Sequence, residues 1–322
     1  MIRKQVPSIN NVNMLFLMVG ILLLFVGSRV QRNDLFTGVL ITEYLLILLP
    51  NIVFLKFKKF SLKEVLKLNS LTLKQVVYII FIMLFAYPVA VFLNFIMIAM
   101  INSISQAMPV GVPIPDNFID YIIGLFVVAV TPGICEEVMF RGTMQAAYSK
   151  IGEKKGLMIT SLLFGVFHFN LLNLLGPIFL GFVLGVILIK TNSLYGSILG
   201  HILNNGFAMT IGYLLLKSTK NIELLTKDVP LVDNGIQMAV TGLALFSLAL
   251  FSFIGLYILL KNLPISAKEE DYNIEKDLDL LVVEEEILSV NENIDIKERI
   301  MWSPIAIIFG MFIYSNWYYF FY

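Results

Sequence analysis

The sequence predicts an all-α protein, a polytopic transmembrane helical bundle of eight or nine membrane segments around a buried polar cavity. The first observation behind this prediction is composition. Hydrophobic residues make up 58% and charged residues 14% of the 322 residues, whereas soluble domains average roughly 45–50% apolar and about 25% charged residues. The mean hydropathy is +0.85. The second observation is a series of apolar runs, most of them close to the roughly 20 residues that cross a bilayer.

The apolar runs follow one another along the whole chain. They lie at Asn13–Ser28, Leu35–Leu55, Gln75–Ile101, Phe118–Tyr148, Leu157–Asn170, Leu171–Ile189, Ser193–Leu216, Ile236–Leu260 and Ser303–Phe321. The first run is too long for a cleavable signal peptide, and no small-x-small cleavage site precedes Arg29, so we expect a membrane helix there. The fifth run is short for a full span and continues into the sixth with little polar interruption, which leaves eight or nine segments.

Basic residues between the runs predict the topology. Residues 56–74 contain six lysines and a single acid, Glu64, which places this loop in the cytoplasm by the positive-inside rule. The amino terminus and the three lysines of residues 150–155 then also face the cytoplasm. Arg29 and Arg32 fall on the other side, against the rule. We therefore expect a multi-pass integral membrane protein with a cytoplasmic amino terminus.

The chain divides into three predicted regions. Residues 1–117 hold N-terminal transmembrane helices, residues 118–216 a core with polar residues inside apolar runs, and residues 217–322 C-terminal helices. The last region includes an insertion at 266–300 that contains 12 of the 23 acids and 4 of the 23 bases. We expect this insertion to be a solvated cytoplasmic helix or linker, with a regulatory or docking element as the alternative. The other bases are scattered between the runs, which argues against a nucleic-acid partner.

Two glutamates and an arginine interrupt the fourth apolar run, and charged groups at membrane depth usually mark a functional site. Glu136, Glu137 and Arg141 follow Thr131-Pro132-Gly133, where we expect the helix to break and restart with Thr131 as N-cap. The helix dipole would then favour ionised glutamates. Residues four apart share a helix face, so Glu137 and Arg141 should form an internal ion pair. Glu136 points about 100° away and is free to act on a water molecule; a purely structural ion network is the alternative.

The only two histidines of the chain also lie in apolar runs. Phe164 precedes His168 by four residues, and Asn205 follows His201 by four, so each pair shares a helix face. His201 and Asn205 can both donate hydrogen bonds to one oxygen. Taken alone, each motif has a structural alternative, namely a satisfied core histidine or a hydrogen bond between helices. At about 1.5 Å per residue, His168, His201, Asn205 and Glu136 all reach a depth of roughly 12–20 Å from the cytoplasmic surface, so they could share one cavity.

The three blocks together are more specific than any one of them. Glu-Glu-x-x-x-Arg, Phe-x-x-x-His and His-x-x-x-Asn, in this order on successive apolar segments, resemble the CPBP family. That family comprises type II CAAX prenyl endopeptidases and bacterial bacteriocin-processing or self-immunity proteins, often called Abi proteins. The resemblance covers about Phe118 to Leu216 and matches every motif position. It implies that residues 118–216 form the catalytic core of an intramembrane glutamate-type endopeptidase of a bacterial cell membrane, which uses no metal and no other cofactor.

The roles that the resemblance implies agree with the residue types. Glu136, assisted by His168, would act as general base on the water that attacks the scissile carbonyl. His201 and Asn205 would donate to the oxyanion. Structural support of the site would come from Glu137, Arg141 and Phe164. The partners would be membrane lipid and an apolar peptide or lipidated protein substrate. A prenylated CAAX tail, a leader peptide and a membrane-protein fragment all fit, and no residue chooses among them.

Two other hypotheses for the function of the same residues stay open. One Glu and two His could form a three-ligand zinc site, although the chain lacks His-Glu-x-x-His and Asn205 has no role in that scheme. A non-catalytic immunity or transport protein would use these polar residues to line a channel or to pair with one another. Transporters usually show discontinuous helices in both halves, and only one break is expected here. The single cysteine, Cys135, excludes an intramolecular disulfide and a cysteine-only metal site, and it shows no sign of activation as a nucleophile.

Overall fold

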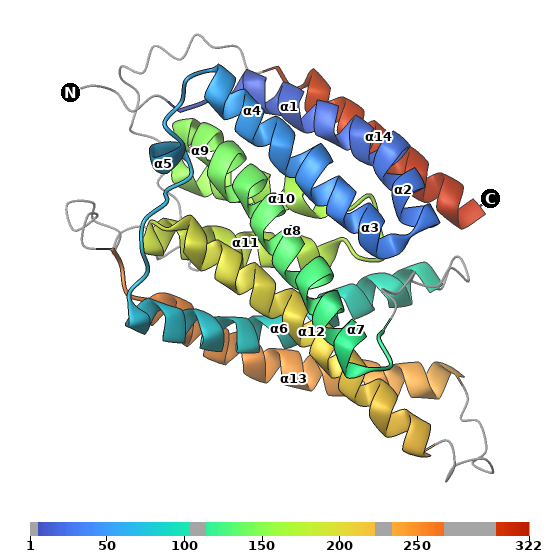
Figure 1. Cartoon of the computed structure of the whole chain (residues 1–322). Coiled ribbons are helices and arrows are strands. Elements are labelled where there is room, and N and C mark those ends of the chain that lie inside the picture. The colour runs from blue at the N-terminus through green and yellow to red at the C-terminus, as the bar shows by residue number, and fades with distance from the viewer. Residues whose placement is uncertain (1–5, 103–113, 223–233, 267–300, 322) are drawn as a thin grey trace, which may run out of the picture.

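The computed structural model describes residues 6–102, 114–222, 234–266 and 301–321, and this part of the chain is helical with no β-strand (Figure 1). The predicted all-α fold class is confirmed. The helices before the candidate site are α1 (Ile9–Leu22), η1 (Leu23–Gly27), α2 (Ser28–Asn33), α3 (Leu35–Leu40), η2 (Ile41–Leu48), α4 (Leu49–Phe57), α5 (Leu62–Val65) and α6 (Leu73–Asn102).

One long helix and five single helices follow. The long helix is built from α7 (Phe118–Gly124), η3 (Leu125–Val130), α8 (Thr131–Glu137), η4 (Val138–Met144), α9 (Gln145–Tyr148) and η5 (Ser149–Ile151). The others are α10 (Glu153–Phe167), α11 (Leu175–Thr191), α12 (Leu194–Ile222) and α13 (Asn234–Asn262). The described chain ends in α14 (Ser303–Phe321), which packs beside α1, while α13 packs along α6 on the opposite side of the bundle (Figure 1).

Six helical stretches of the described residues are long and apolar enough to cross a membrane. They are Ile9–Asn33, Leu35–Phe57, Leu73–Asn102, Phe118–Ile151, Leu194–Ser218 and Gly235–Asn262. The shorter α11 is also apolar, whereas α10 and α14 lie outside this set although both coincide with predicted apolar runs. The chain is a multi-pass integral membrane protein. The total of eight or nine membrane segments stays a prediction, as does the division at residues 117 and 216.

The outer surface of the bundle is apolar. On α13, Leu243 and Phe251 are each 68% exposed, and Ile254 is exposed beside them. Large exposed apolar faces are rare on soluble monomers, and hydrocarbon imposes no cost on them. These side chains therefore face lipid.

The predicted helix break at Thr131-Pro132-Gly133 is wrong, because the helix runs on without interruption from α7 to η5. Thr131 has helical backbone angles, φ −62° and ψ −56°, and is no N-cap. Pro132 has no N–H to donate to the preceding turn, and the π-helical segment η3 directly before it widens the helix to accommodate the ring. The carbonyl of Val128 accepts a hydrogen bond from Asn205 Nδ2 instead, at 3.0 Å. Without a helix start at this point, the dipole argument for ionised glutamates also fails.

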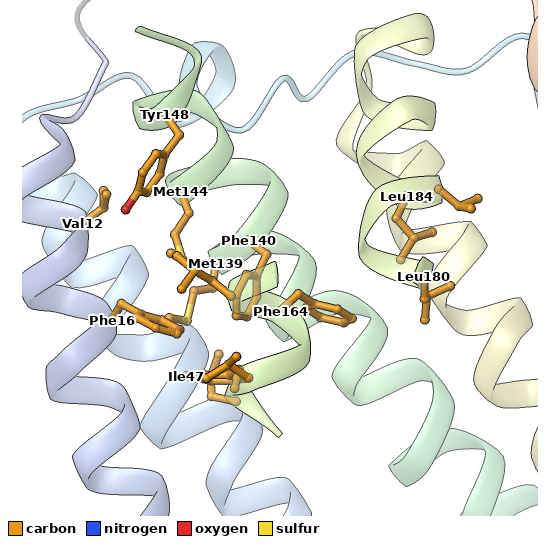
Figure 2. Packing of buried hydrophobic residues seen from close by; sticks show 14 of the residues in the cluster. Val12, Phe16, Ile47, Met139, Phe140, Met144, Tyr148, Phe164, Leu180 and Leu184 are labelled. Atoms are coloured by element: carbon orange, nitrogen blue, oxygen red, sulfur yellow. The ribbon is translucent and has the colours of Figure 1, made fainter. Parts of the chain in front are cut away.

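An aromatic cluster fixes the helix of the candidate site against its neighbours. The ring of Phe140 in η4 meets the rings of Phe164 and Phe167 in α10 edge-on, with centroids 5.0 Å apart in both pairs. Phe16 of α1 stacks on Phe167 at 5.7 Å. Figure 2 shows Phe16, Phe140 and Phe164 side by side in the core. Such pairs add about 0.5–1.5 kcal/mol each beyond their buried area, so α1, η4 and α10 form one packed unit.

Small residues let α12 approach the helix of the site. A Cβ atom at Gly133 would lie 2.6 Å from Cγ1 of Ile202 and 3.3 Å from its backbone nitrogen. Only glycine fits at this crossing of α8 and α12. The close approach brings the polar side chains of α12 within reach of those on α8.

The insertion predicted at 266–300 lies outside the described residues apart from Ser266. The end of α13, which precedes the insertion, is bound to α11. The buried Lys190 of α11 donates from Nζ to the carbonyls of Leu260 and Lys261, at 2.6 Å and 2.9 Å. These are carbonyls of the last turn of α13 that have no partner within the helix. Lys190 thereby joins the ends of α11 and α13.

Candidate active site

Glu137 is the most deeply buried polar side chain of the site, with no exposed surface. Its Oε1 lies 3.1 Å from Nη1 of Arg141, so the predicted ion pair is present in the structure. The same oxygen accepts a hydrogen bond from Nδ1 of His201 on α12, at 2.8 Å. The bond to His201 was not predicted from the sequence. One carboxylate therefore connects the positive charge of its own helix with the imidazole of the neighbouring helix.

Arg141 is held by three different contacts. Besides the ion pair, its Nη2 donates to the carbonyl of Gly181 on α11, at 3.2 Å, and its guanidinium lies over the ring of Phe164, 4.3 Å from the centroid. The ring of Phe164 also meets those of His168 and His201 edge-on, at 5.2 Å and 5.7 Å. Phe164 thus touches the arginine and both histidines, the arrangement expected of a supporting residue.

The hydrogen bond to Glu137 determines which nitrogen of His201 faces the site. A carboxylate only accepts, so Nδ1 carries a proton, and Nε2 points towards Glu136, with 4.0 Å between Nε2 and Oε2. Asn205, one turn later on α12, donates one of its two amide hydrogens to the carbonyl of Val128. Its second amide hydrogen remains for a ligand.

Glu136 differs sharply from its neighbour Glu137. It is 7% exposed, and its Oε2 has no hydrogen-bond partner among the described residues. His168, at the end of α10, donates from Nδ1 to the carbonyl of Phe164 at 2.9 Å, which leaves its Nε2 available. No hydrogen bond or ion pair joins His168 to Glu136 within the described part of the chain.

A cavity of about 570 Å³ brings the predicted catalytic residues together. Its lining includes Glu136, His168, His201 and Asn205, which come from α8, the end of α10, and α12. The volume lies in the range of small-molecule and cofactor pockets, roughly 300–1,000 Å³. The arrangement places a carboxylate, two imidazoles and an amide around one space inside a membrane protein.

Sequence reasoning missed a third acid of this site. Glu43 of η2 is 7% exposed, lines the same cavity, and has no partner for its Oε2 among the described residues. It belongs to no recognisable motif. The signal that could have revealed it was its position as a lone acid in the middle of the run Leu35–Leu55, since ionisable groups at membrane depth are expensive and usually functional.

The described residues contain no group of three or more His, Cys, Asp or Glu side chains placed to hold a metal ion. In particular, Nδ1 of His201 is used by Glu137. The buried thiol of Cys135 is absent from the cavity lining.

Comparison with known families agrees with the motifs. Residues 118–207 match the model of the type II CAAX prenyl endopeptidase Rce1-like family. The family resemblance predicted from the sequence is confirmed for this part of the chain, and the matched family is one of proteases. No curated protein and no solved structure matches the chain. The matched span contains all the motif residues: Glu136, Glu137, Arg141, Phe164, His168, His201 and Asn205.

The ion pair gives a test of stability. Arg141→Met keeps an apolar stem but leaves Glu137 as an uncompensated buried charge, which costs about 3–5 kcal/mol. Arg141→Met combined with Glu137→Gln removes both charges and should regain a large part of that loss. Unfolding by denaturant in detergent micelles measures both. Lys155→Met, on the exposed face of α10, is the matched control, and an Arg141→Met protein as stable as this control would contradict the buried network.

Proposed function

We propose that the protein, which carries an Rce1-like domain at residues 118–207, is an intramembrane endopeptidase that hydrolyses peptide bonds with a glutamate-activated water. The observation that carries the proposal is the environment of Glu136. Its Oε2 has no hydrogen-bond partner among the described residues, lies 4.0 Å from Nε2 of His201 and belongs to a cavity that both histidines line, while the adjacent Glu137 is paired with Arg141. A general base needs a free carboxylate beside a space for water and substrate.

In the proposed reaction, the oxygen of the water attacks the scissile carbonyl carbon while Glu136 accepts a proton from that water. The carbonyl oxygen becomes the oxyanion, and the bond between carbon and nitrogen then breaks as the proton passes to the leaving amine. His168 assists from the same cavity, because its Nδ1 donates to a backbone carbonyl and its Nε2 is left to bind the water. Together these two residues contribute the factor of about 10²–10⁴ typical of acid–base catalysis.

The oxyanion would be stabilised from α12. For His201 to donate from Nε2, the ring must be protonated on both nitrogens, and the two carboxylates that face the ring, Glu137 at Nδ1 and Glu136 at Nε2, offset the added charge together with that of Arg141. Asn205 would contribute its second amide hydrogen. Donors of this kind are effective in a site from which water is excluded, because the positive ends of their dipoles already point to the place where charge develops.

The substrate in this proposal is a membrane-associated peptide or protein, such as a CAAX-type prenylated tail or a bacterial leader peptide. A cavity between transmembrane helices admits an apolar or lipidated chain from the surrounding lipid. We place the protein in a bacterial cell membrane, with its amino terminus in the cytoplasm.

The first test removes the base. Glu136→Gln keeps the shape of the side chain but cannot accept the proton, so cleavage of a fluorogenic peptide in nanodiscs should fall by at least about 10²-fold. The melting temperature should stay near that of the wild type, since Glu136 makes no bond that stabilises the fold. Glu64→Gln, the same change on an exposed acid, is the control. Normal turnover by Glu136→Gln would exclude it as the base.

The second test concerns metal independence. Because the proposed chemistry uses only side chains, the initial rate of cleavage should be unchanged after dialysis against EDTA and phenanthroline. Zinc added back to the dialysed protein should not raise the rate. Loss of activity on chelation with stoichiometric recovery by zinc would favour the metalloprotease instead.

The third test separates the two uses of Asn205. As an oxyanion donor it acts on the transition state, so Asn205→Ala should lower kcat by about 10²–10³-fold with little change in KM. As a structural partner of Val128 it should cost only about 0.6–2 kcal/mol of stability. Asn51→Ala is a matched control, because Asn51 also donates its amide to a helix carbonyl, that of Ile47 at 2.8 Å, away from the cavity. Equal turnover in the two variants would leave Asn205 a structural residue only.

A further inference from the structure

We propose that a second, smaller cavity beside the site binds a cationic side chain of the substrate, a lysine or arginine close to the scissile bond, with Glu43 as its counter-ion. This inference rests on the proposed function and adds a chemical feature of the substrate. It begins from a partly open cavity of about 300 Å³ lined by the first two membrane-spanning helices, the end of α10 and Glu136 of α8.

The smaller cavity borders the proposed catalytic residues. Glu43, Glu136 and His168 line both this cavity and the larger one, so the three side chains stand at the boundary between the two spaces. A peptide whose backbone lies in the larger cavity against Glu136 can therefore extend a neighbouring side chain past this boundary. The pocket then takes a residue next to the bond that is cut.

The walls of the pocket suit a long side chain with a charged end. Apolar surface from Leu23 and Phe167 lines it together with the polar side chains of Ser28, Gln31 and Thr42. The polar ones are already bound, since Ser28 donates to a backbone carbonyl and Gln31 donates to Thr42 at 2.9 Å. At about 30 Å³ per water, the cavity has room for one long side chain and a few waters.

Glu43 supplies the charge that such a side chain needs. It is 7% exposed and its Oε2 has no hydrogen-bond partner among the described residues. A buried carboxylate without a partner is costly. No lysine or arginine is among the described side chains that line either cavity, and Arg141 is paired with Glu137. Such a carboxyl group either holds a proton or binds a cation, and the cation that Glu43 lacks is expected from a ligand.

The position of Glu43 next to Glu136 strengthens the argument. The two carboxylates line the same two cavities, and two ionised carboxylates in a poorly solvated site repel one another. A bound ammonium or guanidinium offsets this repulsion at the moment when Glu136 must act as a base. A neutral side chain of the same size fills the space but leaves the repulsion in place, so the cation is preferred over its neutral equivalent.

The test is a lysine scan on the full-length protein in nanodiscs. A membrane-anchored fluorogenic peptide carries one lysine, moved in turn through the positions that flank the scissile bond. At each position it is compared with norleucine, which keeps most of the stem and lacks the charge. We expect the wild type to prefer lysine at one position by about tenfold or more in kcat/KM, the lower range for close charge pairs. If the wild type prefers lysine at none of the positions, the proposal is overturned. This part of the test requires no variant of the protein.

Substitution of Glu43 then assigns the preference. Glu43→Gln should bring the ratio of kcat/KM between the lysine and norleucine peptides to about one, since the coupling between two close charges is lost when one of them is removed. Glu43→Asp should retain part of the preference, and Glu64→Gln all of it. If Glu43→Gln lowers turnover of both peptides equally in a protein with a wild-type melting curve, Glu43 belongs to the reaction chemistry and the pocket is refuted.

Binding separates this proposal from the proposed function. Fluorescence anisotropy of the same two peptides is measured on Glu136→Gln, with and without Glu43→Gln. Tighter binding of the lysine peptide that depends on Glu43 supports the pocket even if no peptide is cleaved, in which case only the protease assignment fails. Equal binding of both peptides, with cleavage intact in the wild type, refutes the pocket and leaves the protease assignment standing.

Discussion

The buried carboxylate of Glu137, shared between Arg141 and His201, is the interaction on which the rest of the site depends. Inside a membrane protein a single unpaired charge is costly, and truncating one partner of a buried pair leaves the other uncompensated. Because Arg141 is bound by Glu137, the group that faces the adjacent Glu136 is Nε2 of His201, 4.0 Å from Oε2. Because Glu137 also accepts from Nδ1 of His201, the other imidazole nitrogen is aimed at Glu136. One structural carboxylate thus sets the environment of the reactive one.

A second constraint comes from Pro132, which deprives the helix of one backbone donor in the middle of the bundle. The carbonyl of Val128 is satisfied by Asn205 from α12, and Gly133 lets that helix come close enough to reach it. The site helix and α12 are therefore linked by a hydrogen bond whose donor also faces the cavity. Such a link holds the amide in place before any substrate binds, which is the condition for effective electrostatic stabilisation of a transition state.

The sequence predicted those features that depend on spacing along one helix. The apolar runs gave the helices, and the separation of four residues gave the pair of Glu137 with Arg141. Features that need the register between helices could not be predicted, and the bond between His201 and Glu137 is one of them. The expected break at Pro132 failed for the same reason, since its remedy comes from Asn205, more than seventy residues later. Glu43 escaped notice because it stands alone on its helix with no motif around it.

Three carboxylates meet in this region, and each has a different source of positive charge. Glu137 is balanced by an arginine of the protein. Glu136 faces Nε2 of His201 and loses its negative charge when it takes the proton of the attacking water, which links its charge to the reaction. Glu43 has no cationic counterpart among the described residues that line the two cavities, and in our proposal the substrate provides it. In this proposal, Glu137 serves stability, Glu136 serves catalysis and Glu43 serves substrate specificity. It also gives the cavity a means of rejecting peptides, because a substrate without a cation leaves a charge unpaired in a poorly solvated space, and that penalty is a source of discrimination.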